Sequence, residues 1–77
     1  MSRTFLDDGL MQWEAFASTG DYGFPARSRL VFLCLSDPGR RARYVSHAGD
    51  KADTERVLQD ASPAELAELL RNARELS

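Results

Sequence analysis

The sequence of 77 residues contains one cysteine, one histidine and no apolar run near the roughly 20 residues that span a bilayer. The single cysteine, Cys34, excludes an intramolecular disulfide, which is typical of a reducing compartment. The first ten residues lack the basic and apolar regions of a secretory signal. We therefore expect a soluble, cytoplasmic protein, and the opening Met1 fits a complete small chain.

The same scarcity argues against catalysis and metal binding. One histidine and one cysteine inside an apolar run are too few for a zinc site, and the carboxylates lack the spacing of a calcium loop. Ser46, His47 and Asp50 are residue types of a catalytic triad, but neighbouring strand residues point to opposite faces. Ser46 and His47 should therefore diverge, and we expect no enzyme, cofactor, metal or small-molecule substrate.

The composition is that of a small globular domain. Hydrophobic residues make up 43% of the chain and charged residues 29%. Residues 1–77 should form a single domain, and a chain this short buries only about 60% of its unfolded surface. A partner or a second copy would add stability.

Two segments in the first half of the chain predict strands. Residues 10–18 alternate between apolar and polar positions, which favours a strand with Trp13 facing inward, although the composition is also that of a helix. Residues 29–36 contain six consecutive apolar residues, 30–35. A short run without a polar face is typical of a central strand that is covered on both sides.

A third strand is predicted for residues 41–47, after a turn at Asp37–Arg40. Proline followed by glycine in this turn favours type II geometry, in which Gly39 takes a positive φ. The short connection makes the second and third strands an antiparallel hairpin. Alternation places Tyr44 on the same face as Trp13, and Val45 on the other.

Two helices are predicted after Gly49, over residues 51–60 and 63–76. Asp50 or Asp53 is suited to cap the first helix. Ser62 and Glu65 match a capping box for the second, with proline at its first position.

The expected fold is therefore α+β, a three-stranded antiparallel sheet in the order β-β-β-α-α, with both helices packed on the face that carries Trp13 and Tyr44. Residues 1–9 are expected to be an irregular lead-in.

Such a sheet leaves one face open, yet its central strand is apolar on both faces. An exposed apolar stripe bordered by charge indicates an interaction surface. The stripe is one face of the central strand, either Leu30, Phe32 and Cys34 or Val31, Leu33 and Leu35. We expect it to be flanked by Phe16, Val45 and the stems of Arg41 and Arg43, which are the predicted partner-binding residues. We therefore predict a small soluble interaction module that binds a protein partner or forms a homodimer. The alternative is that residues 1–9 or the loop at 19–28 fold back over this face.

Five arginines favour a second hypothesis, nucleic-acid binding. Residues 27–49 carry five arginines against one carboxylate, whereas the rest of the chain is acidic. Close together on one sheet, these side chains would neutralise phosphates, with Trp13, Tyr22 or Phe24 stacking on bases. The five are Arg27, Arg29, Arg40, Arg41 and Arg43. The overall pI of 5.2 argues against this alternative.

The loop at 19–28 is longer than an ordinary hairpin connection, and loops of this length often carry function. Its aromatic residues, Tyr22 and Phe24, are predicted to pack against the sheet edge, and its end adds Arg27 and Arg29 to the basic region.

Overall fold

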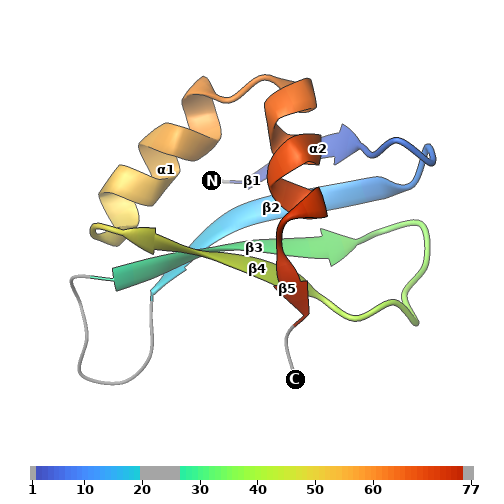
Figure 1. Ribbon diagram of the computed structural model, residues 1–77, viewed down its shortest axis with the longest axis horizontal. Helices are drawn as coiled ribbons and strands as arrows, with labels where there is room; N and C mark the ends of the chain where they lie inside the picture. Colours follow the sequence, from blue (N-terminus) through green and yellow to red (C-terminus); the bar gives the residue numbers. More distant parts are fainter. Residues whose placement is uncertain (1, 20–26, 76–77) are drawn as a thin grey trace.

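A computed structural model describes residues 2–19 and 27–75 of the chain. It contains five strands in one antiparallel sheet, with each strand beside its neighbour in the sequence. The strands are β1 Ser2–Leu6, β2 Gln12–Thr19, β3 Arg27–Cys34, β4 Arg43–Ala48 and β5 Arg74–Glu75. Helices α1 (Lys51–Asp60) and α2 (Pro63–Arg71) both lie on one side of the sheet (Figure 1). The predicted α+β class, with an antiparallel sheet and two helices, is confirmed.

The prediction of three strands is wrong, because a strand is added at each edge of the sheet. Residues 2–6 are not an irregular lead-in but pair with β2, placing Phe5 opposite Trp13. At the other edge, Arg74 and Glu75 pair with Tyr44 and Arg43 of β4. Five- and two-residue strands are too short for their alternation to stand out in the sequence, and their pairing depends on residues far away in the chain.

The turn predicted at Asp37–Arg40 is present, but its conformation differs from the expected type II. The Arg40 N–H donates to the Asp37 carbonyl at 3.0 Å, and the Asp37 carboxylate accepts from the Gly39 N–H. Among the described glycines, only Gly49 has a positive φ. The Asp37 side chain therefore stabilises this turn without a left-handed glycine.

Both helix starts follow the predicted capping chemistry. Asp50 accepts from the Asp53 N–H, Ser62 accepts from the Glu65 N–H, and each partner side chain returns a bond to the cap. The second helix ends at Arg71 rather than at residue 76. The Asn72 N–H closes the last turn on the Leu69 and Leu70 carbonyls, after which the chain enters β5.

Gly49 is the link between β4 and α1 that requires glycine. Its φ is +139°, and an added Cβ would lie 2.8 Å from an Asp53 carboxylate oxygen. That carboxylate accepts from the Asp50 N–H in the capping box. A side chain at position 49 would therefore strain the backbone and displace the cap.

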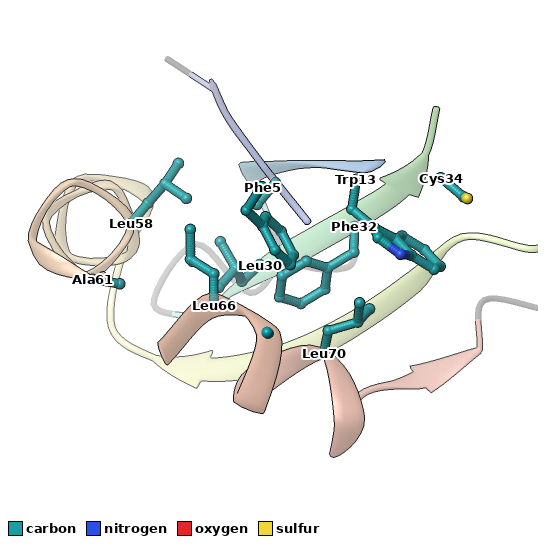
Figure 2. Packing of buried hydrophobic residues seen from close by; sticks show 11 residues of the cluster. Phe5, Trp13, Leu30, Phe32, Cys34, Leu58, Ala61, Leu66 and Leu70 are labelled. Atoms are coloured by element: carbon teal, nitrogen blue, oxygen red, sulfur yellow. The ribbon is translucent and has the colours of Figure 1, made fainter. Parts of the chain in front are cut away.

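The core lies between the sheet and the two helices (Figure 2). Phe5 and Phe32 meet edge to face, with ring centroids 5.9 Å apart. The helices add Leu58 and Leu66, both fully buried, and Leu70. β2 and β3 contribute five side chains to this core: Trp13, Ala15, Leu30, Phe32 and Cys34.

The strand register places Val45, not Tyr44, on the helix-covered face. Leu30 pairs with Val45, and Val45 packs against the core. Tyr44 pairs with Val31 and therefore lies on the opposite face. The expectation for Trp13 is confirmed and that for Tyr44 is wrong, because relative facing depends on the register between strands, which alternation within one strand does not specify.

Arg3 joins the N-terminal edge strand to the end of α1. Its guanidinium donates to the carbonyls of Leu58 and Ala61 at 2.9 and 2.6 Å. The last carbonyls of a helix have no partner within the helix and carry its partial negative charge. Arg3 therefore caps α1 from a strand that lies more than fifty residues earlier in the chain.

Asp7 organises the turn between β1 and β2. Its carboxylate accepts from the Trp13 indole N–H at 2.8 Å and from the backbone N–H groups of Gly9 and Met11. Burial by itself raises the pKa of Asp7, but these hydrogen bonds and the charge of Arg40 outweigh it and hold the pKa below its usual range.

Leu70→Ala should lower the free energy of unfolding by about 2–5 kcal/mol, because Leu70 is almost fully buried in the core. Leu69→Ala, at the next and half-buried position, should cost less than about 2 kcal/mol. Urea denaturation of the two variants measures the difference. Equal costs would show that α2 is not docked in this orientation.

Asp7→Asn should destabilise the protein at neutral pH and flatten its acid dependence. Because folding lowers the pKa of Asp7, its contribution is full above the unfolded pKa of about 3.9 and is lost as the pH falls through the folded value. Urea denaturation between pH 7 and pH 3 should show the two proteins converging in acid. Asp8→Asn is the control, and a pH-independent difference for Asp7→Asn would contradict the prediction.

Candidate interaction surface

The face of the sheet opposite the helices carries a cross-strand row centred on β3. In register, Ser2, Phe16, Val31, Tyr44 and Arg74 follow one another across the five strands. Val31 is 7% exposed, and Phe16 and Tyr44 on either side of it are half-buried. Both helices pack on the other face, so this row receives no cover from α1 or α2 (Figure 1).

Three exposed leucines continue this surface toward the end of the sheet where β1 and β3 end. Leu33 lies on β3 and is 38% exposed, while Leu6 is 55% and Leu35 47% exposed. Leu6 pairs with Gln12, and the Leu35 N–H donates to the Gln12 carbonyl at 2.8 Å, so Gln12 lies between them. We call Leu6, Leu33 and Leu35 the leucine patch.

Leu10 lies in the turn at the same end of the sheet. Its φ is +64°, in the left-handed region that non-glycine residues rarely adopt, and its side chain is 76% exposed. A hydrogen bond from its N–H to the Asp7 carbonyl closes the turn. The Leu10 side chain therefore adds almost no surface to the buried core, while its backbone conformation is strained.

Charged residues of both signs border the apolar row. The Arg29 guanidinium lies over the Tyr44 ring, with its carbon 4.8 Å from the ring centroid. Glu14 on β2 pairs in register with Leu33 and accepts a hydrogen bond from the Ser2 hydroxyl. An apolar centre with a mixed polar rim is the usual composition of a protein–protein interface.

Of the four residues predicted to bind a partner, the structure places one, Phe16, on the open face. Val45 and Arg43 lie on the helix-covered side, for the register reason given above. Arg41 is exposed and precedes β4 without belonging to the sheet. Of the two alternatives left open for the central strand, the structure places Val31 and Leu33 on the open face, whereas Leu6 was not predicted to contribute to this surface.

The predicted arginine surface is not assembled. Arg29 pairs with Ser46 on the open face, whereas Arg43 pairs with Phe32 on the helix side. Arg40 lies in the hairpin turn and Arg41 just after it. The side chain of Arg27 lies outside the described residues.

The aromatic residues predicted to stack on bases are not available together either. Trp13 is 1% exposed and its indole N–H is bound to Asp7, so it cannot stack on a base. Tyr22, Phe24 and the rest of the segment 20–26 lie outside the described residues, and so does the prediction made for that loop.

The triad-type residues diverge as predicted, and His47 has a structural role. Ser46 pairs with Arg29 and His47 with Ser28, on opposite faces. His47 Nδ1 lies 3.2 Å from the Thr54 hydroxyl, which also contacts the Ser28 hydroxyl. Ser28 and Thr54 are fully buried and reach the Asp50 carbonyl, so this network fixes the start of α1 on the sheet.

The part of the chain that the structure describes holds no group of three or more residues able to ligate a metal ion. Cys34 is buried in the core. Within those same residues, no helix has the length and apolar character needed to cross a membrane.

Comparison with known proteins gives no relative. No family model, curated protein or solved structure matches the chain.

Leu10→Asn should leave the free energy of unfolding unchanged or raise it by up to about 1 kcal/mol, because asparagine adopts the left-handed region more readily than leucine. Urea denaturation is the measurement. Leu6→Asn, at an exposed position in ordinary strand geometry, is the control and should lower stability slightly. A loss above about 1 kcal/mol in Leu10→Asn would mean that the leucine side chain is needed for folding.

Proposed function

We propose that this chain is a small interaction module that binds a protein partner, or a second copy of itself, through the open face of its sheet. The observation that carries the proposal is the leucine patch, because Leu33 and Leu35 belong to the central apolar run yet remain exposed in the folded chain. Folding buries one face of this run and also Val31 on the other, and it leaves Leu33 and Leu35 as the surface in contact with water. Covering it would release apolar surface from water, which is the main driving force of association.

The shape and border of the surface support the same proposal. A sheet face without a helix presents a continuous surface, and Phe16 and Tyr44 supply the aromatic contact area in which interfaces are enriched. Glu14 and Arg29 on the border provide charges that set orientation more than affinity. The small size of the domain adds a thermodynamic reason, because a short chain buries a smaller fraction of its surface and a partner would add to it.

Nucleic-acid binding draws less support. It required the five arginines to share one surface, and the described ones are divided between the two faces of the sheet and the hairpin turn.

Leu33→Ser should weaken the association without unfolding the protein, because serine removes apolar surface from a partly exposed position. Val57→Ser is the matched control, since Val57 is 37% exposed, close to the 38% of Leu33, but lies on α1. Sedimentation equilibrium over a range of concentrations gives the average mass of each protein. If the wild type self-associates, Leu33→Ser should shift the equilibrium toward monomer and Val57→Ser should not.

If the wild type is monomeric at every concentration, cross-linking in cell extract tests whether the surface binds another protein instead. The wild type and Val57→Ser should then capture the same protein, and Leu33→Ser should lose it. Equal behaviour of Leu33→Ser and the wild type in both measurements would contradict the proposed function.

A further inference from the structure

A small hollow lies beside Trp13 on the helix side of the sheet, away from the open face. It is open to solvent and has a volume of about 180 Å³, between the β1–β2 turn, the start of β4 and helix α2. Its apolar wall is formed by Trp13, Ala67 and Leu70. Its polar wall is formed by three arginines and two aspartates: Arg40, Arg43, Arg71, Asp7 and Asp8.

The two aspartates are already engaged by other groups. Asp7 accepts from the Trp13 indole N–H and from two backbone N–H groups. Asp8 is paired with the Arg71 guanidinium. This leaves Arg40 and Arg43 as the cations of the hollow whose side chains form no hydrogen bond or ion pair with the described residues.

The neighbours of these two arginines do not neutralise them directly. Glu75 lies opposite Arg43 in the β4–β5 register, but the two side chains form no ion pair. Arg40 acts on Asp7 through its charge and helps to lower the pKa of that carboxyl, without a hydrogen bond between them. The lining as a whole carries three cations and two anions, and so a net charge of +1.

The backbone around both arginines is fixed by local structure. Arg40 closes the turn by donating from its N–H to the Asp37 carbonyl, and Arg43 begins β4 opposite Phe32 of the core. Arg40 is exposed and Arg43 half-buried, so a ligand entering from solvent would meet both side chains.

We propose that Arg40 and Arg43 bind a small oxyanion, a phosphate or carboxylate group, in this hollow. A guanidinium is planar and presents paired N–H donors that match two oxygens of such a group. A volume of about 180 Å³ is below the range of drug-sized ligand sites, which limits the bound part to a small group. The Trp13 and Leu70 side chains are buried and form the apolar floor of the hollow.

The site is independent of the open face, because the hollow lies on the side of the sheet that carries Trp13 and α2. The site also gives a role to two of the five arginines in residues 27–49 that do not lie on the open face. Of the five, Arg40 and Arg43 line the hollow, and Arg41 between them does not.

Titration followed by NMR tests the proposal, with the single tryptophan as a built-in reporter. Inorganic phosphate, methyl phosphate and acetate are added to the full chain at constant ionic strength, with chloride as the reference anion. Trp13 indole N–H and Arg43 amide resonances should shift and saturate with at least one of the three oxyanions and not with chloride. Shifts with inorganic phosphate alone would indicate that the site binds a free anion. Shifts with methyl phosphate would indicate that it binds a phosphate group attached to a larger molecule.

Arg40→Gln and Arg43→Gln should each raise the apparent Kd about tenfold or more, because each removes a charge-assisted pair of hydrogen bonds. Arg41→Gln, which changes the net charge equally outside the hollow, should bind like the wild type. Arg40 is exposed in a turn, so its variant tests the site even if Arg43→Gln fails to fold. A chloride response equal to that of the oxyanions, no saturable shift, or equal Kd values for Arg40→Gln and Arg41→Gln would overturn the proposal.

Discussion

The structure depends on burying β3, a strand with apolar residues on both of its faces. Leu30, Phe32 and Cys34 face the helices, while Val31 and Leu33 face the other way. The hydrophobic effect favours burial of both faces of this strand, but α1 and α2 both lie on the same face of the sheet. The outer face is shielded in part by Phe16 and Tyr44 on the neighbouring strands, and it is left exposed at Leu33 and Leu35. This unequal cover connects the fold to the proposed function.

The N-terminal strand β1 completes the packing on the helix-covered side of the sheet. Phe5 from β1 meets Phe32 edge to face, and Arg3 of the same strand caps the carbonyls at the end of α1. The Ser28–Thr54–His47 network fixes the other end of that helix. Because each end of α1 is tied to a strand, this helix has a defined place on the sheet.

The starts of both helices could be predicted from short stretches of the sequence, whereas the two edge strands could not. The Ser62–Glu65 box and the Asp50 cap involve neighbouring residues, so residue spacing predicts them. β1 and β5 form because β2 and β4 each have an edge with backbone groups available for pairing. The residues of β1 and β5 alone do not reveal that such an edge exists. The face on which Tyr44 and Val45 lie depends on the register between β3 and β4, which the sequence does not specify. The prediction therefore placed Phe16 on the correct face but Val45 and Arg43 on the wrong one. Arg40 and Arg43 were singled out by composition, but only the fold shows which arginines share a hollow.

The proposed function requires that Leu33 and Leu35 are exposed in the monomer and covered on association. Solvent paramagnetic relaxation of methyl groups by a gadolinium chelate measures this directly, at micromolar and at millimolar protein. The account predicts strong relaxation of the Leu33 and Leu35 methyls in the dilute monomer, and protection in the concentrated protein or with a captured partner. Val57, on the helix side, should be relaxed equally throughout. Protection of Leu33 and Leu35 in the dilute monomer would show that the chain covers its own face, and would contradict the account.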